Sequence, residues 1–326
     1  MNNKEIPIIF MGTPDFAVGI LDRLIEEQYN VVAVVTNPDK PQGRGLKLTY
    51  SSVKSYILDK GLNIPVLQPV SLKDEGFIKE LQSYDAQLFI VVAFKMLPEV
   101  IWKMPTLGTF NLHTSLLPQY RGAAPINWAV INGDKESGVT TFMIDKEIDT
   151  GAIILQERCT LDERETAGTL HDKLMHIGAG VVTKSIDLIV ENKIALQPQG
   201  NLITTQEPLK GAPKLNKENT RIDWNTPIET LNCFIRGLSP YPSAHATLVY
   251  KDDVIPLKIF DAEPVQAEKL PSLPVGEIVT DGKKTLYVRC ANGFLSIKEL
   301  QLAGKKRLKI HEVLAGFRDI ELYHFE

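Results

Sequence analysis

The chain has 326 residues, 44% of them hydrophobic, and a formal net charge of -4 at pH 7. This length is enough for a large core and suggests roughly two domains. The slight negative charge argues against a general binder of polyanions.

The three cysteines, Cys159, Cys233 and Cys290, lie far apart in the sequence. Their spacing is not that of a metal site, so we expect no metal, and free thiols fit a reducing cytosol. The sequence shows neither a signal peptide nor an apolar run of about 20 residues that would indicate a membrane span. We expect a cytoplasmic monomer without a membrane partner.

The first part of the chain alternates short apolar strands with amphipathic helices. We expect strands at 6–10, 31–35, 64–66 and 87–92, and helices at 16–28, 51–60 and about 70–83. Continuous apolar strands between helices are typical of a parallel sheet covered on both faces. The turn after the first strand contains Gly12 but not the G-x-G-x-x-G pattern, so dinucleotide binding has little support.

Residues 37–47 form a basic segment rich in proline and glycine, Asn-Pro-Asp-Lys-Pro-Gln-Gly-Arg-Gly-Leu-Lys. This composition is typical of a mobile surface connection. The alternative is a flexible arm that carries cations to phosphate groups.

The stretch from residue 109 to residue 151 concentrates the side chains capable of chemistry. Residues 109–113 alternate like a strand, so Asn111 and His113 point to the same side. Both precede the end of the strand, and ligands of open α/β sheets bind outside the carboxyl ends of strands. Their N–H groups can donate to an oxygen that becomes negative during acyl transfer, and a histidine can move a proton near neutral pH.

Asp149 follows in Asp149-Thr150-Gly151, a combination typical of a tight turn. A loop carboxylate there could orient His113 or accept a proton from an amine, and the sequence leaves its distance from His113 open. A structural interpretation competes with this one, because Asn-x-His on a strand and Asp-Thr-Gly in a turn often have no catalytic role.

The rest of the chain predicts a short helix at 125–130, strands at 139–143 and 152–155, and a long helix at 169–190 that carries His171 and His176 as structural or exposed residues. Residues 196–211 are polar and predict a linker. A helix at 228–237 and short strands at 246–249, 257–259, 276–279, 286–290 and 295–300 then predict a small OB-like barrel. The predicted domains are 1–195 and 212–326.

Several of these motifs together resemble the folate-dependent formyltransferases. They are Asn111-Leu112-His113, Ser115-Leu116-Leu117-Pro118, Arg121-Gly122-Ala123-Ala124-Pro125 and Asp149-Thr150-Gly151, with further similarity at 12–16 and 238–242. The resemblance implies that Asn111, His113 and Asp149 are catalytic. It also implies that the segment Ser115, Leu116, Leu117 and Pro118 lines the tetrahydrofolate pocket. Residues 93–98 depart from the family, which more often has tyrosine and glycine in a slightly longer loop.

The resemblance is strongest to family members that act on charged tRNA, because these have a matching basic loop with an arginine in Gly-Arg-Gly. It implies that Arg44 meets the tRNA, that 10-formyltetrahydrofolate donates the formyl group, and that the α-amino group of methionyl initiator tRNA accepts it. The run Lys305-Lys306-Arg307 is usually a solvated turn, but with a tRNA substrate it becomes a candidate phosphate contact. The implied fold is α/β, a Rossmann-like, mainly parallel formyltransferase domain followed by the OB-like barrel.

Three other functions stay open at this point. A formyltransferase for a sugar amine or another small amine would share Asn111, His113 and Asp149 but usually lacks the basic loop. A non-catalytic tRNA-binding protein would not need these three residues. A dinucleotide oxidoreductase would need the missing glycine pattern.

Overall fold

The computed structural model describes residues 3–42, 47–203, 208–265 and 271–326. The chain divides into two compact units that are discontinuous in sequence. The first contains residues 1–122, 137–159 and 171–211, and the second contains residues 123–136, 160–170 and 212–326. The two short segments 123–136 and 160–170 therefore belong to the unit built mainly from residues 212–326. The domain boundaries 1–195 and 212–326, with a linker at 196–211, stay a prediction.

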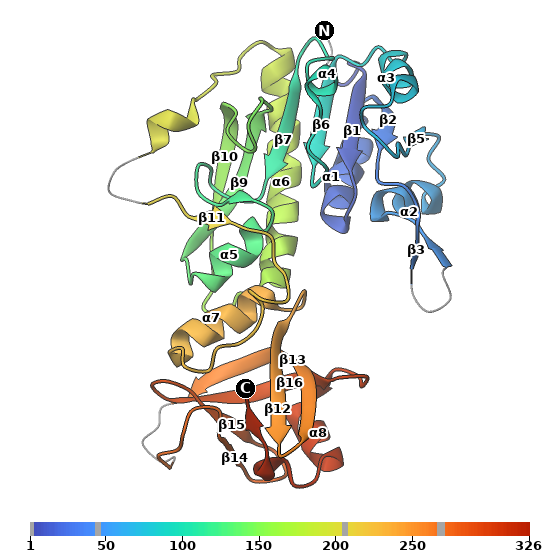
Figure 1. Ribbon diagram of the computed structural model, residues 1–326. Helices are drawn as coiled ribbons and strands as arrows, with labels where there is room; N and C mark the ends of the chain where they lie inside the picture. Colours follow the sequence, from blue (N-terminus) through green and yellow to red (C-terminus); the bar gives the residue numbers. More distant parts are fainter. Residues whose placement is uncertain (1–2, 43–46, 204–207, 266–270) are drawn as a thin grey trace. The chain divides into compact units, whose positions relative to one another are not determined.

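The first unit is built on a seven-stranded sheet with the strand order β10-β9-β7-β6-β1-β2-β5 (Figure 1). The strands are β1 Ile8–Gly12, β2 Val31–Val35, β5 Val66–Leu67, β6 Leu88–Val92, β7 Thr109–His113, β9 Glu136–Met143 and β10 Ile153–Thr160. The pairs from β5 to β7 are parallel, whereas β9 is antiparallel to β7. This arrangement confirms the predicted Rossmann-like α/β fold.

The helices that accompany this sheet are α1 Asp15–Glu26, α2 Ser52–Asp59, α3 Glu75–Gln82, α4 Glu99–Trp102 and α6 Ala167–Val190. Ser51 caps α2, because its hydroxyl accepts the N–H of Lys54 at 3.1 Å. Asp74 caps α3 in the same way at the N–H of Phe77. These caps satisfy N–H groups that have no partner inside the helix.

Both faces of the central strands are buried, which explains their continuous apolar sequences. Every residue of β1 and β6 is buried. Alternate residues point to opposite faces. One face packs against α3 and α4 in a core cluster that contains Ile9, Met11, Phe89, Val91, Phe77, Leu81 and Ile101.

A hairpin occurs within the segment for which the sequence predicts only a loop. Strand β3 (Lys40–Gln42) pairs antiparallel with β4 (Lys47–Thr49). Arg44, the predicted tRNA contact, lies between the two strands in the sequence and outside the described residues.

Side chains distant in sequence hold the base of this hairpin. Lys54 Nζ donates to Asp39 Oδ2 at 2.5 Å and to Gln68 Oε1 at 2.7 Å. Gln68 Nε2 donates in turn to Asp39 Oδ1 at 2.8 Å. The hydrogen bonds from Gln68 and Lys54 lower the pKa of the Asp39 carboxyl. Such partners have no local signal, so the sequence does not predict the two strands.

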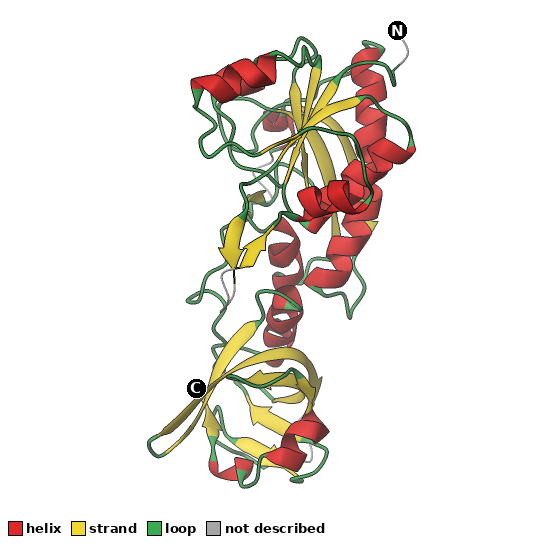
Figure 2. Ribbon diagram, turned by 90° about the vertical axis from the view of Figure 1, so that its right-hand side faces the viewer, coloured by secondary structure: helices red, strands yellow, loops and turns green. Residues whose placement is uncertain are grey.

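The second unit is built on an antiparallel sheet with the strand order β14-β15-β16-β13-β12-β18, and β17 pairs with β16. The strands are β12 Ala244–Tyr250, β13 Asp253–Val265, β14 Ile278–Thr280, β15 Leu286–Arg289, β16 Phe294–Leu302, β17 Leu308–Lys309 and β18 His324–Phe325. The N–H of Phe325 donates to Gly276 O at 2.8 Å, and Glu277 bridges His324, so the two ends of the sheet meet. The sheet is nearly closed, which confirms the predicted OB-like barrel (Figure 2).

Three helices belong to the second unit, namely α5 Pro125–Ile131, α7 Ile228–Leu238 and α8 Ile310–Gly316. Helix α5 packs against α7, where Asn127 Nδ2 donates to Gly237 O at 2.8 Å. A Cβ added at Gly237 would lie 2.5 Å from Ile131 Cγ1, so glycine permits this close approach. The sequence predicts α5 and α7 but not α8.

The remaining short elements are β8 Arg121–Gly122, β11 Gly211–Ala212, η1 Gln199–Leu202 and η2 Ile320–Leu322. Strands β8 and β11 form a two-stranded ladder. Within the described ranges, the structure has no helix that is long and apolar enough to cross a membrane.

Alanine substitutions at two glycines of α6 test how this helix packs. A Cβ added at Gly180 meets nothing within 4 Å, so we expect Gly180→Ala to raise the free energy of unfolding by about 0.5–1 kcal/mol. A Cβ added at Gly178 would lie 2.8 Å from Leu112 Cδ2. We therefore expect Gly178→Ala to lower the free energy of unfolding, since overpacking costs about 1–3 kcal/mol. Urea unfolding of the two variants measures the difference, and equal effects would contradict this account of the interface between α6 and β7.

Candidate active site

Asn111 and His113 lie on β7 at the carboxyl end of the parallel strands, where ligands of open α/β sheets bind. In the sheet, Asn111 is paired with Val91 of β6 and Phe142 of β9. His113 is buried, with 6% of its surface exposed, and Asn111 is half-buried. The side-chain oxygen of Asn111 is buried and has no hydrogen-bond partner among the described residues. An unsatisfied amide at this position suits a partner that arrives with a ligand.

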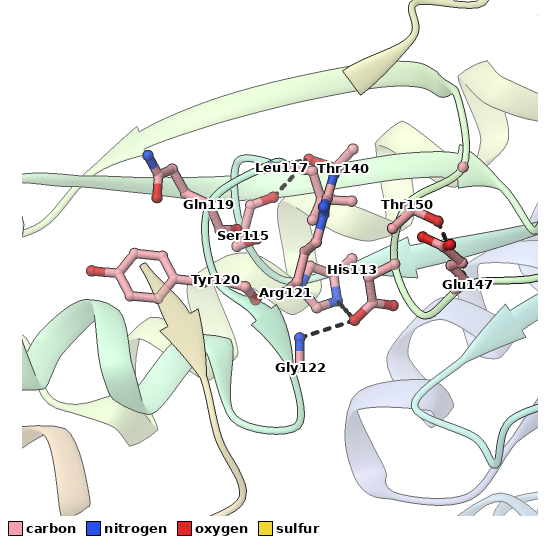
Figure 3. A network of polar contacts seen from close by, with 12 residues as sticks. His113, Ser115, Leu117, Gln119, Tyr120, Arg121, Gly122, Thr140, Glu147 and Thr150 are labelled. Carbon is pink, nitrogen blue, oxygen red and sulfur yellow. Dashed lines mark hydrogen bonds and ion pairs between the residues drawn. The ribbon is translucent and has the colours of Figure 1, made fainter. Parts of the chain in front are cut away.

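Asp149 comes within reach of His113. Its Oδ2 lies 3.9 Å from His113 Nδ1, and the same oxygen accepts the N–H of Gly122 at 3.0 Å (Figure 3). His113 Nε2 lies 2.9 Å from Tyr120 O. Because a carbonyl can only accept, Nε2 carries a hydrogen, and Nδ1 is the ring nitrogen that can exchange a proton. The Asp149 carboxylate stands where it would attract the protonated ring.

The tight turn predicted at 149–151 is present and depends on local backbone geometry. Asp149 adopts a left-handed φ of 56°. A Cβ added at Gly151 would lie 1.7 Å from Met143 O, so only glycine fits there. Asp145 Oδ1 accepts the N–H of Glu147 at 3.1 Å and the hydroxyl of Thr150 at 2.8 Å. These bonds hold the approach to the turn beside the end of β9.

The segment predicted to line a folate pocket, residues 115–118, follows β7 directly. Ser115, Leu117 and Pro118 are buried, and Leu116 is half-buried. The hydroxyl of Ser115 donates to Gln119 O at 2.6 Å, so it is turned toward the backbone of its own loop. The side chains of this segment mainly support the loop.

Strands β9 and β10 hold this segment. Thr140 Oγ1 accepts the N–H of Leu117 at 3.1 Å and donates to Ser115 O at 2.7 Å. Gln156 Nε2 donates to Leu117 O at 2.7 Å and to Thr140 Oγ1 at 2.9 Å. Figure 3 shows Thr140 beside Ser115 and Leu117. The loop therefore has a rigid support on the sheet.

The predicted basic run lies in the second unit, between β16 and β17, and its three side chains differ. Arg307 Nη2 binds Glu299 Oε2 at 2.5 Å, and the guanidinium lies 4.2 Å from the centroid of the Phe260 ring. This bond lowers the pKa of the Glu299 carboxyl. Lys305 and Lys306 are exposed, and within the described ranges neither forms an ion pair. Arg307 thus has a structural partner already, whereas the two lysines are available to a ligand.

Three polar residues near the site have no signal in the sequence. Thr140 lies on the strand predicted at 139–143, and Gln156 lies on β10, one residue beyond the strand predicted at 152–155. Gln199 lies in the predicted linker, and its side chain donates to Asp149 O and Gly151 O at 3.0 and 2.9 Å. Each is an ordinary polar residue whose partners are tens of residues away, so no local motif identifies it.

Family models match both halves of the chain. The model described as formyl transferase matches residues 4–186, and the model described as formyl transferase, C-terminal domain matches residues 214–318. The chain belongs to the formyltransferase family.

Relatives within the formyltransferases align over nearly the whole chain. The methionyl-tRNA formyltransferase of Bacteroides fragilis is 53% identical over 324 residues, which are 99% of this chain and 98% of that protein. The methionyl-tRNA formyltransferase of Flavobacterium johnsoniae is 50% identical over 317 residues, or 96% of each chain.

Solved structures share the fold at lower identity. A variant of HypX from Aquifex aeolicus has a TM-score of 0.64 at 18% identity and is matched by 96% of this chain, which spans about half (47%) of HypX. The sugar 3N-formyl transferase WlaRD has a TM-score of 0.61 at 19% identity, with 92% of this chain and 99% of that chain covered. At these identities the likeness shows the fold alone, and it includes both units.

Thr140 offers a test of how residues 115–118 are held. We expect Thr140→Val to lower the free energy of unfolding by about 1–3 kcal/mol, because the buried N–H of Leu117 loses its partner. Hydrogen exchange at the amide of Leu117 should become faster. Thr141→Val is the matched control, since Thr141 bonds Ser185 at 2.7 Å instead, and should leave that amide protected. Unchanged exchange at Leu117 in Thr140→Val would contradict the assigned support.

Proposed function

We propose that this protein transfers a formyl group from 10-formyltetrahydrofolate to the α-amino group of the methionine carried by initiator tRNA. The observation that carries the proposal is the identity of about half of all residues to methionyl-tRNA formyltransferases, over nearly the whole of both chains. The product, formylmethionyl-tRNA, would serve translation initiation in the cytoplasm. The barrel-like second unit is included in this similarity.

The proposed reaction is an acyl transfer. The amine nitrogen forms a bond to the formyl carbon, whose oxygen takes the electron pair. Collapse of this intermediate breaks the bond between the carbon and the folate nitrogen, and the proton released by the amine ends on that nitrogen. Holding the amine and the donor together supplies much of the rate by proximity.

Asn111 and His113 are assigned to the oxygen that becomes negative. Asn111 lies near the end of β7, where its side-chain N–H can donate to this oxygen. Its buried Oδ1, which is an acceptor, has no hydrogen-bond partner among the described residues. His113 acts through Nδ1, because its Nε2–H is bound to Tyr120 O. The protonated ring donates from Nδ1 and can pass a proton to the departing folate nitrogen.

Asp149 is assigned to the proton path. Its carboxylate lies 3.9 Å from His113 Nδ1, where it can orient the histidine ring, and it can receive the proton that the amine releases. The N–H of Gly122 keeps this carboxylate oriented, since an anion held by a backbone donor does not turn away freely. Residues 115–118 are assigned to the folate pocket, where their supported backbone forms a wall.

The contacts to tRNA are assigned to cations in both units. Arg44 lies between β3 and β4 in the sequence, and Lys305 and Lys306 are exposed on the second unit. Arg307, paired with Glu299, contributes mainly by holding this turn. Contacts of this kind bind phosphate groups and weaken with salt.

A transfer assay tests the function directly. The purified protein is mixed with labelled 10-formyltetrahydrofolate and with methionyl initiator tRNA, free methionine and an amino sugar as competing acceptors. We expect label on the charged tRNA alone. Asn111→Ala should lower the rate by about 10²–10³-fold, the usual effect of losing one oxyanion donor.

Two outcomes of the same assay contradict the proposal. Label on the small amine alone would reassign the acceptor while keeping Asn111, His113 and Asp149. Binding of tRNA without transfer from the folate donor would indicate a non-catalytic tRNA-binding protein. A rate near that of the parent protein for Asn111→Ala would remove the role given to Asn111.

Arg44→Ala tests the arm separately. We expect KM for methionyl-tRNA to rise and the slope of its logarithm against the logarithm of salt concentration to fall by about one. KM for the folate donor should stay within about twofold, because the hairpin serves only the phosphate contact in this proposal. Lys79→Ala, an exposed cation on α3, is the control. An equal loss for both substrates would show that the substitution disturbs the fold and not a tRNA contact.

A further inference from the structure

The first residues of the predicted linker, 196–211, form hydrogen bonds with β10 and with the turn that carries Asp149. The backbone of Gln197 pairs with that of Ile153 in both directions, at 2.9 and 3.0 Å. The chain then enters η1, whose first residue, Gln199, is 2% exposed. A glutamine is seldom buried to this extent unless its amide is fully hydrogen-bonded. A segment that only connected two units would be expected on the surface.

The amide of Gln199 uses its donors and its acceptor at the same time. Nε2 donates to Asp149 O at 3.0 Å and to Gly151 O at 2.9 Å. Oε1 accepts from Arg121 Nε at 3.1 Å and from Arg121 Nη2 at 2.6 Å. The two N–H donors and both lone pairs of the amide oxygen therefore have partners, and no other side chain of this length offers the same set.

These bonds join the two segments that meet at His113. One is the turn of Asp149, which needs support because a non-glycine residue at φ 56° is strained. The other contains Arg121, between Tyr120, whose carbonyl binds His113 Nε2, and Gly122, whose N–H binds the Asp149 carboxylate. Gln199 thus fixes the backbone from which both partners of the His113 ring are presented.

We propose that Gln199 is a positioning residue for formyl transfer, which acts by holding the Asp149 turn and the Arg121 segment in register around His113. This inference rests on the proposed function of the site. It gives the start of the predicted linker a role in the reaction. The hydrogen bonds of the Gln199 side chain go to Arg121, Asp149 and Gly151, and not to residues 115–118, which are assigned to the folate pocket. A displacement of about 1 Å at a reacting group can cost on the order of 100-fold in rate.

Two substitutions separate the two halves of the amide. Gln199→Glu keeps an oxygen for Arg121 but removes the N–H groups that bind Asp149 O and Gly151 O. Gln199→Met keeps the length of the side chain and removes every hydrogen bond. Gln197→Met is the matched control, because the Gln197 side chain is exposed and, among the described residues, Gln197 forms hydrogen bonds only through its backbone.

We expect kcat for transfer to methionyl-tRNA to fall by about 10–100-fold in both Gln199 variants. KM for the tRNA and for 10-formyltetrahydrofolate should stay within about twofold, because the substrate contacts are elsewhere. Gln197→Met should behave as the parent protein. A rise in KM with unchanged kcat would overturn the proposal, since Gln199 would then serve binding alone.

A double-mutant cycle with Asp149→Asn shows whether Gln199 acts through Asp149. We expect the loss caused by Gln199→Met to shrink to less than threefold in the Asp149→Asn protein, because the group being positioned is already impaired. If the double variant loses kcat by the product of the two single losses, Gln199 acts independently of Asp149 and the proposal is overturned. So would unfolding of both Gln199 variants, since the residue would then hold the fold and not the site. Absence of transfer by the parent protein is a different result, which would refute the proposed function itself.

Discussion

The arrangement of the site depends on a backbone constraint at residues 149–151. Asp149 occupies a left-handed conformation, and Gly151 approaches Met143 O so closely that no Cβ fits. Because the chain can turn this tightly at the end of β9, the Asp149 carboxylate reaches His113 on the neighbouring strand β7. The sheet places Asn111 and His113 at the carboxyl edge of its parallel strands, where ligands of open α/β sheets bind, and the turn adds an acidic group beside His113.

The bonds around this turn come from segments that are distant in sequence. Gly122 binds the carboxylate, Gln199 binds the backbone of the turn, and Tyr120 binds the histidine ring. The end of the predicted linker joins the same network, because Tyr120 N–H donates to Lys210 O at 2.7 Å. Gln199 and Lys210, which lie between the two regions matched as formyltransferase domains, are therefore part of the structure around the site.

The second unit shows how a small sheet avoids exposed edges. Phe325 near the C-terminus pairs with Leu248 on β12 and also bonds Gly276 before β14, so the final residues close the barrel. Closure removes a strand edge that could otherwise pair with another chain. The same unit shows why a basic run is a weak indicator of nucleic-acid binding. One of its cations, Arg307, neutralises Glu299, and only the neighbouring lysines are left for a ligand.

The sequence by itself determined the mainly parallel sheet, the barrel and the family, because hydrophobic periodicity, caps and motifs such as Asn111-Leu112-His113 are local patterns. It did not predict β3, β4, β17, β18 or α8. These four strands have only two or three residues each, and each of them forms by pairing with another strand. Only the tertiary structure decided that Asp149 faces His113, that Gln199 holds the turn and that Arg307 is paired. Each of these contacts depends on where backbone segments lie after folding, and hydrogen bonds act only over a few ångströms.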